Sequence, residues 1–127
     1  GLVTPVVRGA EKLSLTGVVT TIRDYAARAG QGRLLQHELD GGTLTVTNLG
    51  MFGVEEFAAI INPPQVGILA VGAVVKQPVV GAADQLEVGS VVTVTLSVDH
   101  RPVDGVLAAQ WLNRLRELIE NPIQILV

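Results

Sequence analysis

The longest apolar run of the chain, Val66 to Val75, limits the folds that the sequence can adopt. It is nearly continuous and rich in valine, as a strand buried on both faces of a sheet requires. The run falls well short of the roughly 20 residues needed to span a bilayer. It therefore predicts a central strand, with other strands beside it and helices over its faces.

Three other segments have the composition of strands. Leu2 to Arg8 is apolar and β-branched around Pro5, which favours a place at a sheet edge. Thr43 to Asn48 is rich in Thr, Leu and Val, and β-branched residues recur along Gln85 to Val98. We expect the long Gln85 to Val98 strand to follow a turn at Gly81 to Asp84.

Two segments carry apolar residues at helical spacing. The first follows Ser14, which can cap a helix, and ends near Gly30. The second runs from about Gly105 to Ile119, and its apolar stripe is wide enough to cover a sheet. Leu35 to Leu39 is consistent with one further helical turn. The expected fold class is α/β, with one mixed sheet and helices packed against it.

Composition excludes several functions. A chain of 127 residues, 48% of them hydrophobic, is long enough for one globular domain. Its formal net charge of −3 provides no long-range attraction for nucleic acid or an anionic membrane, so neither is an expected partner. There is no cysteine, and the two histidines, His37 and His100, are too few for a metal cluster, so no metal site is expected.

The two ends of the chain are unusual. It starts at Gly1 without a methionine, which favours a fragment of a longer protein. The last six residues include four large aliphatic side chains, at a terminus where exposure is normal: Ile123, Ile125, Leu126 and Val127. This tail either folds back onto its own sheet or docks into a neighbouring subunit.

The segment whose residues suggest a catalytic function is Asp99 to Gly105. It lies between the end of a predicted strand and the start of a predicted helix. His100 is predicted on a loop held by rigid elements, where catalytic groups are common. Asp104 can orient this loop through hydrogen bonds or a cation. It can also simply cap the helix, a role that needs no catalytic function.

His100-Arg101-Pro102-Val103-Asp104-Gly105 resembles the active-site motif of the dihydrolipoamide acyltransferases, the core subunits of 2-oxo acid dehydrogenase complexes, and of the related chloramphenicol acetyltransferases. Three further stretches match the acyltransferases in order and approximate spacing, and they are Gly-Leu-Val-Thr-Pro-Val-Val-Arg (1–8), Gly-Gly-Thr-Leu-Thr-Val-Thr-Asn-Leu-Gly-Met-Phe-Gly (41–53) and Ile-Ile-Asn-Pro-Pro-Gln (60–65). The resemblance covers essentially the whole chain. Asn48 to Gly53 and Ala109 to Leu112 look most like the acetyl-transferring member, from pyruvate dehydrogenase complexes.

The resemblance implies a chloramphenicol-acetyltransferase-like fold that is N-terminally truncated. Residues 1–127 would then be the C-terminal portion of the acyltransferase catalytic domain. The family's lipoyl and peripheral-subunit-binding domains are not expected in this chain, since neither Lys12 nor Lys76 lies in an Asp-Lys-Ala context. The lipoyl group would be carried on a domain outside it.

The chemistry that the resemblance implies is transfer of an acetyl group between the thiols of coenzyme A and dihydrolipoamide, by direct thiol attack. His100 would take the proton of the attacking thiol, because imidazole titrates near neutral pH. Thr47 stands at the position of a family serine whose hydroxyl stabilises the oxyanion, and its extra methyl restricts χ1. By residue type alone Thr47 is an ordinary strand residue. Asp104 completes the expected catalytic set, and supporting roles are implied for Asn48, Gly50, Arg101 and Gly105.

The family also implies partners. Its members form homotrimers, with the histidine and the hydroxyl on different subunits, and join them into cubic or dodecahedral cores through C-terminal residues. Ile123, Ile125, Leu126 and Val127 are therefore expected at assembly contacts, and other dehydrogenase-complex subunits are expected partners of a full-length protein. The expected location is the cytoplasm of a bacterium or the mitochondrial matrix of a eukaryote.

Two other functions compete with the catalytic one. A truncated or engineered assembly scaffold of the same fold, without catalysis, is favoured by the missing N-terminal portion, whereas retention of His100, Asp104 and the Thr47 hydroxyl favours catalysis. A chloramphenicol acetyltransferase shares the histidine motif but not the Asn-Leu-Gly-Met-Phe-Gly and Asn-Pro-Pro-Gln stretches.

Overall fold

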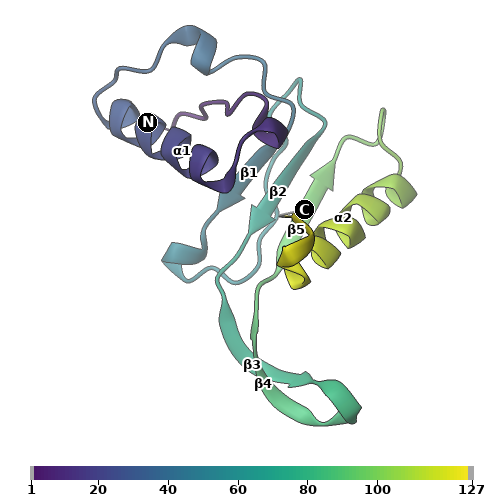
Figure 1. Ribbon diagram of the computed structural model, residues 1–127. Coiled ribbons are helices and arrows are strands. Elements are labelled where there is room, and N and C mark those ends of the chain that lie inside the picture. Colours follow the sequence, from purple (N-terminus) through teal and green to yellow (C-terminus); the bar gives the residue numbers. More distant parts are fainter. Residues whose placement is uncertain (1, 126–127) are drawn as a thin grey trace. The chain divides into compact units, whose positions relative to one another are not determined.

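The computed structural model describes residues 2–125 (Figure 1). The chain divides into two compact units, Gly1–Thr43 and Leu44–Val127. Neither helix in the described range is long and apolar enough to cross a membrane.

The first unit is built around helix α1, Leu15–Gly30. The Ser14 hydroxyl accepts a hydrogen bond from the Gly17 N–H at 3.0 Å, so the predicted helix start is confirmed. Short 3-10 turns lie at Ala10–Lys12 and Gln36–Glu38, the second where one helical turn was expected.

The predicted strand at Leu2 to Arg8 is wrong, since residues 2–7 form no strand. Pro5 cannot donate a ladder hydrogen bond, and the segment is held instead by separate hydrogen bonds, including those from the Arg8 guanidinium to the His37 and Asp40 carbonyls. The Val6 N–H donates to the Glu38 carbonyl at 2.7 Å, and the Tyr25 hydroxyl donates to the Val6 carbonyl at 2.8 Å. A β-branched composition without a neighbouring strand thus gives an extended segment only.

The second unit contains a three-stranded mixed sheet in the order β1-β2-β5. Its strands are β1 (Thr45–Asn48), β2 (Gly67–Val71) and β5 (Val94–Val98). β1 runs parallel to β2, and β5 antiparallel. The central strand β2 carries the buried apolar side chains of the described residues, Ile68, Leu69 and Ala70. The predicted central strand and the α/β class with a mixed sheet are confirmed.

Two strand predictions need correction. The strand predicted over the apolar run Val66 to Val75 ends at Val71. The Gln85 to Val98 segment divides into two strands. The extra strands, β3 (Val75–Val80) and β4 (Leu86–Val91), pair with each other in a second, antiparallel sheet. The chain changes partner at Gly72, whose N–H donates to the Thr93 carbonyl at 3.1 Å. Apolar composition marks a strand but not the residue where its partner changes, so the expected single sheet is two sheets.

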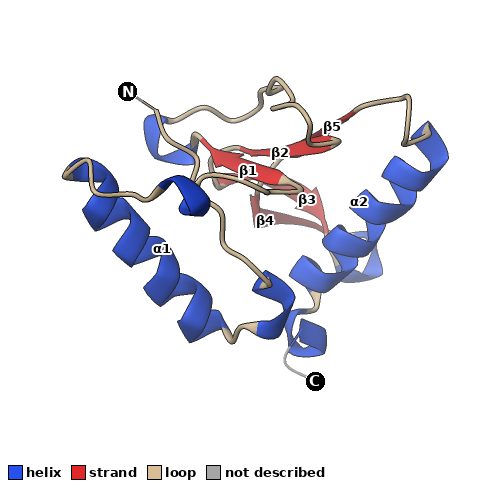
Figure 2. Cartoon of the chain, turned by 90° about the horizontal axis from the view of Figure 1, so that it is seen from above, coloured by secondary structure: helices blue, strands red, loops and turns tan. Residues whose placement is uncertain are grey.

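Helix α2, Gly105–Glu120, follows β5 and contacts it, as the apolar stripe predicted (Figure 2). The 3-10 turn Pro122–Ile125 continues from α2 and contacts that helix. In this turn Ile123 and Ile125 are exposed. Leu126 and Val127 lie outside the described residues.

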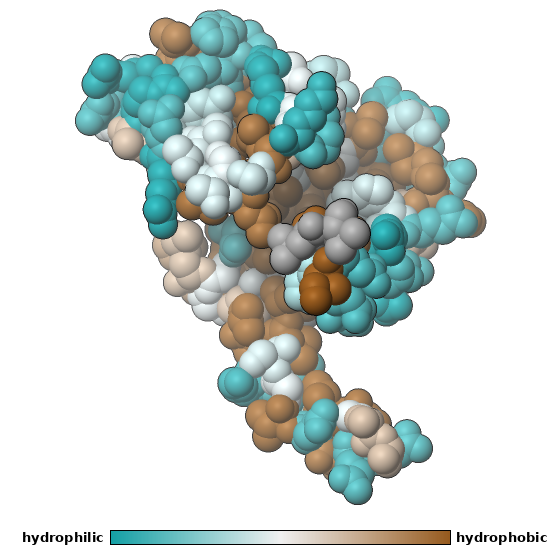
Figure 3. All heavy atoms as spheres, in the orientation of Figure 1, coloured by the Kyte–Doolittle hydropathy of each residue, from teal (hydrophilic) through white to brown (hydrophobic). Residues whose placement is uncertain are grey.

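A large part of the apolar surface of the second unit is exposed. On the β3–β4 ribbon Val80, Leu86 and Val88 are 68%, 79% and 76% exposed, and apolar surface is visible along the ribbon in Figure 3. Pro78 pairs with Val88 and Val80 with Leu86, so these four side chains share one face of the ribbon. Such a face is unusual for a monomer in water.

Candidate active site

The loop that carries His100 is fixed at both ends by regular structure. At its start the Asp99 N–H donates to the Val66 carbonyl at 2.8 Å, which extends the β2–β5 pairing by one step. At its end the Asp104 carboxylate accepts the Leu107 N–H at 2.7 Å and caps α2. His100 therefore lies on an exposed loop between a strand and a helix, as predicted.

This loop forms one wall of a cavity of about 580 Å³. The lining residues are Ile61, Pro63, Pro64, Gln65, Val98, Asp99, His100 and Arg101. Two of the segments singled out in the sequence, 60–65 and 100–105, thus meet in space. Gln65 is tied to the sheet, because its Oε1 accepts a hydrogen bond from the Thr45 hydroxyl. The cavity is open to solvent and combines apolar walls with the polar groups of Gln65, Asp99, His100 and Arg101.

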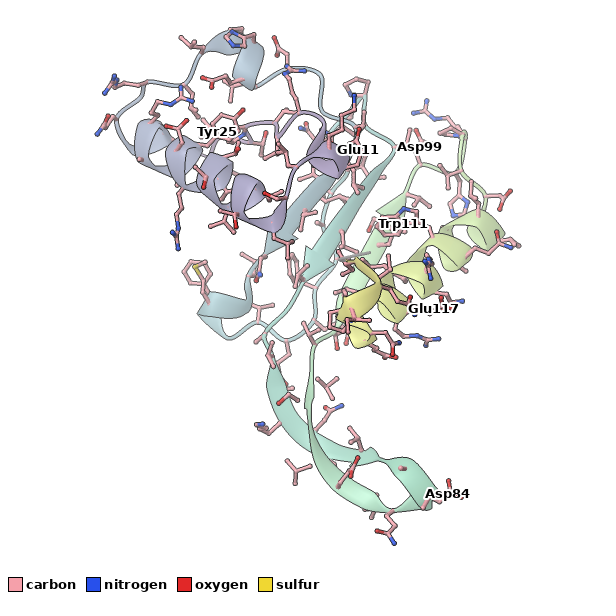
Figure 4. The ribbon with its side chains drawn as sticks, viewed as in Figure 1. Glu11, Tyr25, Asp84, Asp99, Trp111 and Glu117 are labelled. Atoms are coloured by element: carbon pink, nitrogen blue, oxygen red, sulfur yellow. The ribbon has the colours of Figure 1, made fainter. Side chains whose placement is uncertain are left out.

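The charged groups at the cavity are Asp99 and Arg101, which pair with each other. Arg101 donates from Nε to Asp99 Oδ1 at 3.0 Å and from Nη2 to Oδ2 at 2.7 Å. The Arg101 hydrogen bonds hold the pKa of Asp99 at about 2, and the same contact raises the pKa of Arg101. Figure 4 shows Asp99 at the end of β5. The carboxylate is therefore ionised throughout the neutral range.

Asp104 has a local structural explanation, whereas Gly105 has none within residues 2–125. Asp104 forms the helix cap, and its catalytic role stays a prediction. A side chain at Gly105 would meet nothing within 4 Å among the described residues, so the fold itself does not require glycine there.

Asn48 and Gly50 shape the turn after β1. Asn48 Oδ1 accepts the Gly50 N–H at 2.8 Å, and the Leu49 N–H donates to the Val71 carbonyl at 3.1 Å. A Cβ on Gly50 would lie 2.9 Å from the Gly72 carbonyl oxygen, which is too close for a side chain. Asn48 and Gly50 therefore fix the shape of this turn, and their supporting role in the reaction stays a prediction.

Thr47 and His100 are not brought together within one chain. Thr47 pairs with Ala70, and Ala70 pairs with Thr95 on the far side of β2. His100 lies five residues beyond Thr95, and the three residues to the end of β5 alone cover about 10 Å. The two strand spacings between β1 and β5 add about another 10 Å across the sheet.

Sequence reasoning missed the part played by Asp99 and Gln65. Asp99 belonged to the segment singled out around His100, and Gln65 to the Asn-Pro-Pro-Gln stretch. An aspartate two residues before an arginine at a strand end is a usable signal for a side-chain turn. The hydrogen bond between Gln65 and Thr45 joins residues far apart in sequence, so no local sequence pattern predicts it.

Known proteins match the whole chain. The family described as 2-oxoacid dehydrogenases acyltransferase (catalytic domain) matches residues 1–127. The mitochondrial dihydrolipoyllysine-residue acetyltransferase component of pyruvate dehydrogenase complex from Dictyostelium discoideum is 41% identical over 129 residues. The match covers 100% of this chain and 20% of that protein. The chain thus spans about a fifth of the length of this relative.

Two solved structures share the fold of the chain with a TM-score of 0.94 and 31% identity, and each match covers 100% of this chain and 52% of the other. One is the dihydrolipoamide acetyltransferase of Azotobacter vinelandii, and the other is the cubic core of the pyruvate dehydrogenase multienzyme complex. The fold class and the chloramphenicol-acetyltransferase-like architecture expected from the sequence are thereby confirmed. On the family match and these structures, the chain belongs to the acyltransferase family of the 2-oxoacid dehydrogenases, in its catalytic domain.

Proposed function

We propose that the chain acts in acetyl transfer between coenzyme A and dihydrolipoamide, with His100 as the general base. The observation that carries this proposal is the position of His100 on the wall of the 580 Å³ cavity, on a loop fixed by β5 and α2. Residues 1–127 would form the C-terminal portion of an acyltransferase catalytic domain. Coenzyme A and the lipoyl group are substrates in this proposal.

The relative from Azotobacter vinelandii supports the choice of residues. The roles of a serine, a histidine and an asparagine in its catalytic mechanism were investigated. There the asparagine follows the histidine by four residues, as Asp104 follows His100. The serine precedes the histidine by 52 residues, against 53 between Thr47 and His100. Threonine keeps the hydroxyl of serine, and aspartate replaces the amide of asparagine with a carboxylate.

In the proposed reaction the imidazole of His100 takes the proton from the attacking thiol. The sulfur lone pair then attacks the thioester carbonyl carbon, and the π electrons of the C=O bond move to its oxygen. The Thr47 hydroxyl donates a hydrogen bond to that oxyanion. Collapse of the tetrahedral intermediate breaks the original C–S bond, and the departing thiolate takes the proton from the imidazolium. No acyl-enzyme forms.

This mechanism requires a second copy of the chain. Since His100 and Thr47 are far apart within one chain, the Thr47 hydroxyl must come from a neighbour. A contact between two different surfaces of identical chains gives a ring, such as a trimer, when its rotation closes. A homotrimer, joined into a larger core, fits the cubic core among the similar structures and the exposed apolar face of the β3–β4 ribbon. The location proposed is the bacterial cytoplasm or the mitochondrial matrix.

The test is a coupled assay of acetyl transfer from acetyl-CoA to dihydrolipoamide. We expect His100→Ala to lower the rate by about 10²–10⁴ because the thiol loses its base, while circular dichroism shows the fold unchanged. A fully active His100→Ala protein would overturn the mechanism. An inactive wild type that still forms large assemblies would favour the non-catalytic scaffold.

A further inference from the structure

Asp99, the residue before the proposed base His100, makes more contacts within the loop than His100 does. The Asp99 N–H is bonded to the Val66 carbonyl, and the Asp99 carbonyl accepts the Val103 N–H at 3.1 Å. Its carboxylate accepts the backbone N–H of Arg101 at 3.0 Å and the two guanidinium contacts described above. Asp99 therefore joins the rigid sheet to three points of the loop.

The hydrogen bond from the Arg101 N–H to the Asp99 carboxylate closes a side-chain turn with His100 at its centre. The backbone on both sides of His100 is thereby fixed to one carboxylate. Within residues 2–125 the His100 imidazole itself has no hydrogen-bond partner. Its position thus depends on the backbone that carries it.

The two kinds of contact made by the Asp99 carboxylate, the ion pair and the hydrogen bond to the backbone, differ in how much they hold the loop. Its side chain is 21% exposed, whereas that of Arg101 is 90% exposed. An ion pair with such an exposed partner contributes little, because water competes for the guanidinium. The hydrogen bond to the Arg101 N–H lies within the turn, and losing it frees the peptide next to His100.

We propose that Asp99 is a positioning residue for the transfer reaction, and that its hydrogen bond to the Arg101 N–H holds His100 toward the cavity. This inference rests on the proposed function of His100. Asp99 does not touch the reacting atoms. It acts by limiting the positions of the base, and a displacement of about 1 Å in such a group costs up to about 10²-fold in rate.

Three substitutions of Asp99 separate the effect of the hydrogen bond that closes the turn from the effect of the negative charge. Asp99→Asn keeps an oxygen acceptor for the Arg101 N–H and removes the charge. Asp99→Glu keeps the charge and the guanidinium pair but places the carboxylate one methylene too far for the turn. Asp99→Ala removes both. Glu117→Ala is the matched control, because Glu117 also pairs with an arginine, Arg114, but on α2 away from the loop (Figure 4).

The measurement is kcat and KM for acetyl transfer, with the folded fraction followed by circular dichroism at the assay temperature. We expect Asp99→Asn and Glu117→Ala to stay within about threefold of wild type. Asp99→Glu and Asp99→Ala should lose about 10- to 100-fold in kcat with KM for acetyl-CoA little changed. If Asp99→Ala does not fold, the comparison of Asp99→Glu with Asp99→Asn decides whether the turn or the charge matters.

A fully active Asp99→Glu, an Asp99→Asn as slow as Asp99→Ala, or losses that follow the unfolded fraction would each overturn the inference. His100→Ala, measured in parallel, tests the proposed function separately. A slow His100→Ala beside fast Asp99→Glu and Asp99→Ala overturns only the positioning role. A fast His100→Ala overturns the proposed function and this inference with it.

Discussion

At the scale of single residues, two glycines of the matched motifs differ in what a side chain would meet. A Cβ on Gly50 would lie 2.9 Å from the Gly72 carbonyl oxygen and 3.1 Å from Ala73 Cα, so backbone must move to admit it. A Cβ on Gly105 meets nothing within 4 Å among residues 2–125. One glycine is therefore needed by the fold of the single chain, and the other is not.

We expect Gly50→Ala to lower the free energy of unfolding by about 1–3 kcal/mol, the usual cost of overpacking. Gly105→Ala is the control, and it should leave stability unchanged or raise it by up to about 1 kcal/mol, because alanine favours the helix. Urea denaturation of both variants measures the difference. Equal stabilities would show that the backbone at Gly50 adjusts without cost.

At the scale of elements, helices were predicted more accurately than strands. The Ser14 and Asp104 caps lie beside the helices they start, so short sequence patterns located both. Strand partners are set by residues far apart in sequence, and composition did not reveal the break at Gly72 or the β3–β4 ribbon. The same limit applies to the site, because the His100 loop is local whereas its cavity wall at 61–65 is not.

In the first unit, one ion pair links α1 to the 3-10 turn at Gln36–Glu38. Arg28 contacts Glu38 at 2.5 Å, and this hydrogen bond lowers the pKa of Glu38 from 4.5 to about 2. A carboxyl whose pKa is lower in the folded state stabilises the fold above its ordinary pKa. That contribution is lost as the pH falls from about 4.5 to about 2.

We therefore expect Glu38→Gln to reduce the loss of thermal stability between pH 7 and pH 2. Arg28→Gln should reduce it in part, since it removes the main contact that lowers the pKa of Glu38, while the Leu35 N–H still donates to that carboxylate. Thermal unfolding followed by circular dichroism at a series of pH values measures the effect. A wild type and a Glu38→Gln variant with parallel pH profiles would contradict the assignment.

At the scale of the whole molecule, the described tail residues are available to a partner. Ile123 is 74% exposed and Ile125 is 49% exposed. Full burial of each such side chain contributes roughly 1.5–3 kcal/mol before the entropy of association is subtracted. We expect deletion of residues 123–127 to reduce a large assembly to trimers while the fold persists. Light scattering checks this, and an unchanged assembly after deletion, or an intact chain that is monomeric, would contradict it.

The separation of Thr47 from His100 permits a test of where the site is assembled. Thr47→Val keeps the shape of the side chain and removes the hydroxyl, so we expect it alone to lose up to about 10²–10³ in turnover. His100→Ala alone lacks the base. If each site takes His100 from one chain and Thr47 from its neighbour, a mixed ring contains sites in which both groups are intact.

We expect an equal mixture of the Thr47→Val and His100→Ala chains, unfolded and refolded together, to regain about a quarter of wild-type activity. Each site needs its histidine from one variant and its hydroxyl from the other, and random assembly supplies each with a chance of about one half. The two variants refolded separately and then combined are the control, and they should stay as slow as either alone. Without recovery in the co-refolded mixture, both groups would have to act within one chain, which the strand register opposes because it places them at different ends of the sheet.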